Sequence, residues 1–280
     1  MATVKSCAII RLSSNSIWES DLKLLNILGK EIEVVRLVSA HPRPGAPALV
    51  FLHEGLGSVS MWRDFPQRVA DASGCEAIVF SRHGYGRSTP ITEPRTPRYM
   101  HDEALVALPA LLDALGVDAP FLFGHSDGGS IALIHAGGAG RPLAGIIVMA
   151  PHVLVEEVSV TSIEQAKVAY RNTDLKSRLG RYHADVDSTF RGWNDIWLHP
   201  EFRNWNIEEY LPTIACPVMA IQGEDDEYGT MDQIERIARG APDVDLVRLA
   251  DCRHSPHKDQ PEAVIDAVAG FVTRILDARP

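Results

Sequence analysis

One serine of this chain stands in a short glycine-rich pattern that suits nucleophilic catalysis. Ser126 is the centre of Gly124-His125-Ser126-Asp127-Gly128, which follows an apolar run at 121–123 and precedes a helical run at 131–134. A strand that turns this sharply into a helix exposes the central hydroxyl and needs glycines two residues to either side, where a Cβ atom would clash. We therefore predict that Ser126 attacks the substrate; a glycine-rich structural turn is the alternative.

A serine hydroxyl is a poor nucleophile at neutral pH, so it needs a general base, and that base needs an acid to hold its tautomer. Candidates for both follow Ser126 in the chain. The acidic cluster Glu224-Asp225-Asp226-Glu227 comes after an apolar run at 218–221, and His254 and His257 come after a strand-like run. No third ligand follows these histidines closely, which disfavours a metal pair.

Such residues need a frame that brings them together, and the chain alternates strand-like runs with helical stretches. This alternation is typical of an α/β protein with a parallel sheet. The runs that we expect to be strands are 48–52, 77–80, 121–123, 145–149, 218–221 and 244–249. An imperfectly alternating run, 32–38, predicts an antiparallel edge strand. The stretches that we expect to be helices are 62–72, 101–115 and 261–276.

The composition changes between residues 152 and 212. This stretch is richer in charge and carries Trp193, Trp197 and Trp205. It has the pattern of helices placed between two sheet strands. We therefore predict a helical cap at 152–212, inserted into a core formed by 1–151 and 213–280.

Several motifs together resemble the α/β-hydrolase superfamily over nearly the whole chain. The segment Ser126–Ile134 is similar to that of valacyclovir-hydrolase-like and meta-cleavage-hydrolase-like serine hydrolases. The other motifs, in chain order, are the oxyanion-loop segment His53-Glu54-Gly55-Leu56-Gly57-Ser58, the turn Arg82-His83-Gly84-Tyr85-Gly86-Arg87-Ser88, the acid loop Gly223-Glu224-Asp225-Asp226 and the segment Arg253-His254-Ser255-Pro256-His257. The resemblance implies a mostly parallel eight-stranded sheet flanked by helices, with an inserted cap.

The resemblance also implies roles for single residues. The family's acid stands three residues after the loop glycine, which favours Asp226 over Asp225, and its base comes first in the last loop, which favours His254. His257 then packs or hydrogen-bonds beside the base. The oxyanion hole is expected from the backbone N–H groups of Asp127 and of Gly55 or Leu56.

Two positions depart from the family pattern. Glu54 stands where a glycine is usual, which leaves the backbone path of the oxyanion loop open. Arg253 replaces the glycine that usually precedes the base, and here the histidine itself is retained.

The substrate side of the site is less defined by the sequence. The carboxylates of Asp127 and Glu54 suggest a preference for cationic or hydrogen-bond-donating acyl groups, such as amino-acid esters; a purely structural role of Asp127 is the alternative. Apolar cap walls are expected from Trp193 and Trp197, with His152 reaching the pocket. Further candidates of the same kind are Phe190, Trp205, Tyr170 and His183.

The leading interpretation is a carboxylesterase that cleaves a small ester, lactone or thioester through an acyl-enzyme. A carbon–carbon bond hydrolase of the meta-cleavage type uses the same triad, and a non-catalytic receptor on the same fold is the alternative from another class. No cofactor or metal is implied. Aspartate-nucleophile enzymes, such as haloalkane dehalogenases, are disfavoured because position 126 is serine.

Composition narrows the remaining possibilities. The net charge of −10 argues against nucleic-acid partners and mildly against anionic membranes. No apolar run is long enough to span a bilayer, and the start, Met1–Cys7, lacks the pattern of a signal peptide, so we expect a cytoplasmic location. Four cysteines without a CxxC pair suggest free thiols. The oligomeric state is not indicated, and a homodimer stays open.

Overall fold

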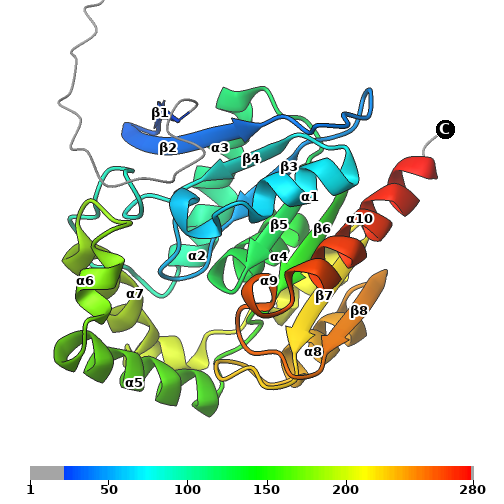
Figure 1. Ribbon diagram of the computed structural model, residues 1–280. Coiled ribbons are helices and arrows are strands. Elements are labelled where there is room, and N and C mark those ends of the chain that lie inside the picture. Colours follow the sequence, from blue (N-terminus) through cyan, green and yellow to red (C-terminus); the bar gives the residue numbers. More distant parts are fainter. Residues whose placement is uncertain (1–21, 279–280) are drawn as a thin grey trace, which may run out of the picture.

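The computed structural model describes residues 22–278; the start of the chain, Met1–Cys7 included, lies outside the described residues. Its centre is an eight-stranded sheet with the order β1-β2-β4-β3-β5-β6-β7-β8 (Figure 1). The strands are β1 (Lys23–Ile27), β2 (Lys30–Leu37), β3 (Leu49–Leu52), β4 (Ala77–Phe80), β5 (Phe121–His125), β6 (Gly145–Met149), β7 (Val218–Gly223) and β8 (Val244–Leu249). This confirms the expected mostly parallel eight-stranded sheet.

Two antiparallel pairings, β1 with β2 and β2 with β4, interrupt the parallel pattern at one side of the sheet. The run at 32–38 does form an antiparallel strand, β2, but it is not at the edge as predicted, because β1 pairs with its outer side. The hydrophobic pattern of the sequence does not predict β1, because the residues of this strand are mostly exposed, with Leu24 47% accessible.

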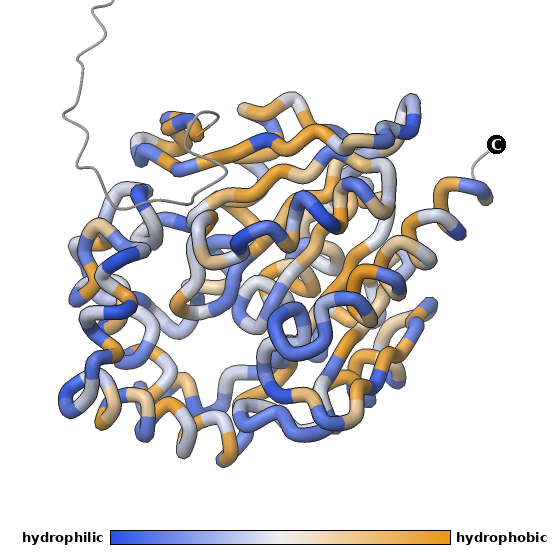
Figure 2. The backbone as a smooth tube through the Cα atoms, viewed as in Figure 1, coloured by the Kyte–Doolittle hydropathy of each residue, from blue (hydrophilic) through white to orange (hydrophobic). Residues whose placement is uncertain are grey.

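Helices cover both faces of the sheet. α1 (Phe65–Ser73) and α10 (Pro261–Asp277) lie side by side on one face, where Phe65, Val69 and Phe271 belong to one apolar cluster (Figure 1). The helices α3 (Leu108–Leu115), α4 (Asp127–Gly138) and α8 (Asp232–Gly240) contribute to a second cluster on the other face. Figure 2 shows the resulting distribution, with hydrophobic residues concentrated along the central strands.

The stretch predicted as one helix at 101–115 is divided into three parts. It consists of α2 (Tyr99–Asp102), a wider π-helical turn η2 (Glu103–Ala107) and α3. Pro109, near the start of α3, has no N–H to donate to the carbonyl four residues earlier, which explains why the regular pattern breaks before it. Likewise, α1 starts at Phe65, after the short turn η1 (Val59–Trp62), and not at residue 62.

Between β6 and β7 the chain leaves the sheet and forms a separate group of helices near the ends of β5 and β6 (Figure 1). The group contains α5 (Glu157–Asn172), α6 (Leu175–Leu179), α7 (Val186–Trp197), η3 (Pro200–Asn204) and η4 (Glu208–Thr213). The short helix α9 (Pro256–Asp259) is not part of this group and follows β8. The division into a cap at 152–212 and a core stays our proposal. No helix among residues 22–278 is both long and apolar enough to cross a membrane.

Candidate active site

Ser126 sits on the turn between β5 and α4, in the strained conformation that the motif predicts. Its φ of 52° and ψ of −118° lie outside the regions that side-chain-bearing residues favour. A Cβ atom on Gly124 would overlap the carbonyl oxygen of Gly128, so the two glycines permit the turn. The backbone N–H of Ser126 donates to Met149 O at 2.9 Å, which fixes the turn against β6.

The structure brings the three candidate triad residues into one chain of hydrogen bonds. His254 Nε2 lies 3.0 Å from Ser126 Oγ, and His254 Nδ1 lies 2.8 Å from Asp226 Oδ1. With the ring proton on Nδ1, His254 donates to Asp226 and accepts from the serine hydroxyl. Asp225, the alternative acid, is exposed, and only its backbone N–H has a hydrogen bond here, to Cys252 O.

Asp226 is held by its own loop. Its Oδ1 accepts from the N–H groups of Tyr228 at 2.8 Å and Gly229 at 3.3 Å, and its Oδ2 accepts from Gln222 Nε2 at 2.7 Å. Burial works to raise the pKa of Asp226, but the positive charge and hydrogen bond of His254 outweigh it and lower this pKa. The carboxylate is therefore ionised and ready to orient the imidazole.

The loop after β3 passes beside Ser126, and Gly55 and Leu56 both line the pocket there, together with Asp127. Because Asp127 is the first residue of α4, its N–H has no partner within the helix. The glutamate at position 54 does not disturb this path. Its carbonyl oxygen accepts from Arg82 Nη2 at 3.0 Å and from Gly57 N at 3.1 Å, which fixes the loop.

Asp127 lines the pocket, but both oxygens of its side chain have partners in the scaffold, which favours the structural alternative. Its Oδ2 accepts from Tyr99 Oη at 2.8 Å, and its Oδ1 accepts from Trp197 Nε1 at 3.2 Å. Arg82 Nη2 lies 3.7 Å from the same carboxylate, and both side chains are almost completely buried. The sequence could not show this, because the three partners come from distant segments.

A pocket of about 190 Å³ lies above Ser126. All five candidates for substrate contacts line it, namely Glu54, Asp127, His152, Trp193 and Trp197. The indole of Trp193 lies where a Cβ atom of residue 55 would be, so the cap packs directly on the oxyanion loop. Burial and the nearby charge of His254 lower the pKa of His152 to about 4, so this imidazole is neutral at pH 7.

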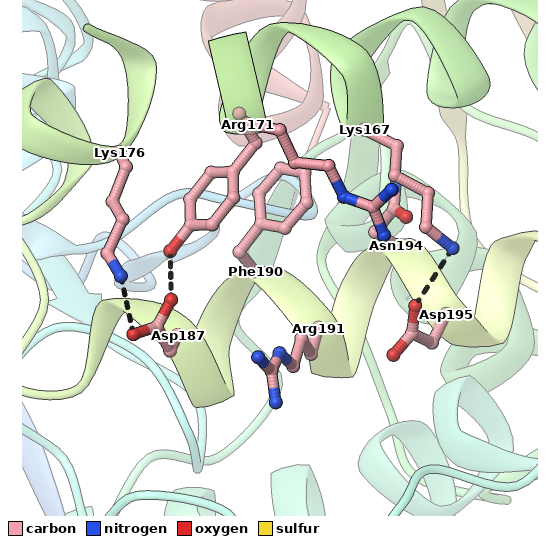
Figure 3. Close-up of a pocket in the computed structure, with 9 residues that line it drawn as sticks. Lys167, Arg171, Lys176, Asp187, Phe190, Arg191, Asn194 and Asp195 are labelled. Atoms are coloured by element: carbon pink, nitrogen blue, oxygen red, sulfur yellow. Dashed lines mark hydrogen bonds and ion pairs between the residues drawn. The ribbon is translucent and has the colours of Figure 1, made fainter. Parts of the chain in front are cut away.

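Other cap candidates lie elsewhere. Tyr170 and Phe190 stack with ring centroids 3.8 Å apart and line a different cavity of about 610 Å³ between α5 and α7 (Figure 3). Trp205 stacks on Phe202 in the cap. His183 connects two loops, because its Nδ1 accepts from Gly86 N and its Nε2 donates to Leu56 O. None of these four candidates is among the lining residues of the pocket above Ser126.

Glu54 and His125, the neighbour of the nucleophile in the chain, are in contact. Glu54 Oε2 lies 3.6 Å from His125 Nδ1, and His125 Nε2 donates to His254 O at 2.7 Å. His257 packs beside this pair, with its ring centroid 4.9 Å from that of His125 and 5.0 Å from that of Trp62. His257 is thus packed against His125 and Trp62.

Several pocket residues were not anticipated. Glu227 and Tyr228, from the acid loop, and Ile163, from α5, line the cavity. Glu227 was visible as part of the acidic cluster, but only the folded loop shows that its Oε2 accepts from His254 N at 3.2 Å. Arg253 is exposed, and its N–H donates to Asp259 Oδ2 at 3.0 Å.

Comparison with known proteins agrees with this geometry. A chain described as a candidate carbamate hydrolase, RutD, from Caulobacter sp. (strain K31) is 26% identical over 83% of this chain and 95% of its own length. The 2-hydroxy-6-oxononadienedioate/2-hydroxy-6-oxononatrienedioate hydrolase 1 of Dechloromonas aromatica (strain RCB) is 22% identical over 82% of this chain and 88% of its own.

Among solved structures, the enol-lactonase of Burkholderia xenovorans LB400 superimposes with a TM-score of 0.71 at 18% identity, covering 90% of this chain and all of that one. This likeness supports the fold. The sequence model of the Alpha/beta hydrolase family matches residues 49–267, which include all three candidate triad residues. The chain therefore belongs to the α/β-hydrolase family.

Proposed function

We propose that this protein is a serine hydrolase that cleaves a small carboxylic ester through an acyl-enzyme on Ser126. The observation that carries the proposal is the hydrogen-bonded chain from Ser126 Oγ through His254 to Asp226, with distances of 3.0 and 2.8 Å. The nucleophile, the orienting acid and the base follow one another along the chain in the order that is usual for this fold.

The steps follow from the positions of these groups. His254 Nε2 takes the proton of Ser126 Oγ while Oγ forms a bond to the ester carbonyl carbon. The carbonyl oxygen becomes an oxyanion next to the N–H groups of Asp127 and the Gly55–Leu56 loop, where one such donor contributes about 3 kcal/mol. The C–O bond to the alcohol then breaks, and His254 returns the proton to the leaving oxygen. Water repeats the sequence and releases the acid.

The size of the pocket favours a small acyl group. Its volume of about 190 Å³ is below the roughly 300–1,000 Å³ of pockets that enclose drug-sized ligands. Lactones and thioesters fit the same chemistry. Carbon–carbon bond hydrolysis is the second candidate, because the relative from Dechloromonas aromatica is named for such a substrate.

A fluorophosphonate probe tests the proposal. We expect covalent labelling of Ser126 in the folded protein, and turnover of a panel of methyl esters that disappears in Ser126→Ala. Absence of both labelling and turnover in the folded protein would favour a non-catalytic receptor. Labelling with turnover of a vinylogous diketone, but of no ester, would favour the carbon–carbon hydrolase.

A further inference from the structure

We propose that the pocket above Ser126 accepts small acyl groups that are neutral or positively charged and rejects acyl groups that carry a carboxylate. The proposal rests on the proposed function, since it concerns the acyl group that Ser126 would receive. Its basis is the charge of the pocket walls. Three acidic residues line the cavity, Glu54, Glu227 and Asp127, of which Asp127 is engaged by Tyr99 and Trp197; among the described residues that line it there is no lysine or arginine.

The two glutamates come from two different loops beside the reacting serine, Glu54 from the oxyanion loop and Glu227 from the acid loop. Burial works to raise the pKa of Glu54, but its contact with His125 and the positive charge of Lys258 hold this pKa well below its usual value. Its side chain keeps 18% of its surface accessible. Glu227 is exposed, and one of its oxygens accepts from His254 N.

Within residues 22–278, the cationic side chains near the pocket are not placed to receive an incoming carboxylate. Arg82 lies behind Asp127, 3.7 Å from its carboxylate, and is fully buried with a hydrogen bond to Glu54 O. Lys258 is exposed and does not line the pocket. His152 lines it but is neutral at pH 7, because its pKa is lowered to about 4 by burial.

An acyl group with its own carboxylate would therefore lose water without gaining a counter-charge, and it would face two like charges. Much of the remaining wall is apolar or aromatic, with Leu56, Ile163, Trp193 and Trp197. They suit a hydrocarbon acyl chain. An ammonium group would instead find Glu54 or Glu227 within the same cavity.

This charge pattern separates the chain from one of its own relatives. The Dechloromonas aromatica hydrolase is named for a dienedioate, which is a substrate with two carboxylates. An enzyme for such a substrate needs positive groups that hold the anions. The pocket described here offers the opposite charge, so a shared triad does not imply a shared substrate.

Pairs of esters that match in shape and differ in charge test the inference. In the first pair, methyl 4-methylpentanoate carries an isopropyl group where monomethyl succinate carries a carboxylate. In the second pair, methyl butyrate carries a methyl group where methyl β-alaninate carries an ammonium group. We expect kcat/KM at pH 7.5, measured by pH-stat, to be on the order of 100-fold lower for monomethyl succinate than for its neutral partner. The value for methyl β-alaninate should equal or exceed that for methyl butyrate.

Variants assign the effect to the two carboxylates. Glu54→Gln and Glu227→Gln should each reduce the discrimination against monomethyl succinate by about tenfold. Glu224→Gln is the matched control, because Glu224 is exposed on the same loop as Glu227 and does not line the pocket. This control should leave the ratio between the two esters unchanged.

The outcomes separate this inference from the proposed function. Equal hydrolysis of both esters of the first pair, with turnover still dependent on Ser126, would overturn the charge selectivity and leave the serine hydrolase standing. If no ester is turned over, the neutral and the anionic acyl group can still be compared by the ability of their amides to protect Ser126 from fluorophosphonate labelling. Protection by 4-methylpentanamide but not by succinamate would support the selectivity, and equal protection by both would overturn it.

Discussion

The side chain of Asp127 offers a sharp test of how the site is built, because its two oxygens contact three distant segments. Tyr99 Oη lies 2.8 Å from Oδ2, Trp197 Nε1 lies 3.2 Å from Oδ1, and the Arg82 guanidinium lies 3.7 Å away. Asp127→Asn preserves the size of the side chain and removes its charge. It removes the negative charge that lies 3.7 Å from the buried Arg82 guanidinium.

Loss of one partner from a buried ion pair costs about 3–5 kcal/mol. The asparagine oxygen can still accept one of the two remaining hydrogen bonds, so we expect the free energy of unfolding to fall by about 3 kcal/mol. Against a typical total of about 5–15 kcal/mol, this change is large and easily measured by urea unfolding. Asp225→Asn, at an exposed aspartate of the acid loop, is the matched control and should change stability by less than about 0.5 kcal/mol.

The same variant separates a structural from a substrate-binding role. If the carboxylate serves only its scaffold partners Tyr99, Trp197 and Arg82, Asp127→Asn should lower kcat/KM for methyl β-alaninate and methyl butyrate by the same factor. A loss confined to the cationic ester would refute this reasoning, and so would a stability loss below about 1 kcal/mol.

Three further predictions concern the neighbouring groups. Asp226→Asn should keep the fold but lower kcat by roughly 10⁴-fold, because the amide favours the wrong tautomer of His254; stopped-flow or burst kinetics with an activated ester would show it. Gly55→Ala should lower kcat/KM by at least about tenfold, since the new methyl group overlaps the Trp193 indole, and Trp193→Leu in the same chain should restore part of the activity. The pKa of His152 is lowered to about 4 in the folded protein, so the unfolded chain binds more protons between pH 4 and 6.5. The free energy of unfolding should therefore rise with pH across that window, which urea unfolding would show. His152→Gln should reduce this rise by about 3 kcal/mol.

The parts of the site that depend on local sequence were the most predictable. The turn around Ser126 is specified by glycines two residues away, and the order of serine, acid and histidine narrowed the triad to a few residues. The central parallel strands were visible because they are buried on both faces and therefore largely apolar, as β6 is.

The parts that depend on long-range contacts were not predictable in the same way. Whether Asp127 faces the pocket or the scaffold depends on Tyr99 and Trp197, which are 28 and 70 residues away in the chain. The aromatic residues of the cap show the same difficulty. Trp193 and Trp197 face the pocket, whereas Phe190, on the same helix, faces the outer cavity of Figure 3, and a helical pattern alone does not show which face meets the core.

The contacts between the cap helices and the core loops also bear on how enzymes of this kind can be recombined. His183 connects to Gly86 and Leu56, Trp193 lies on Gly55, and Trp197 donates to Asp127. A cap transplanted from another family member would therefore carry its own residues into the loops that hold the nucleophile. Chimeras should be active only when donor and recipient already match at these contacts, so the cap and the catalytic loops have to be exchanged together.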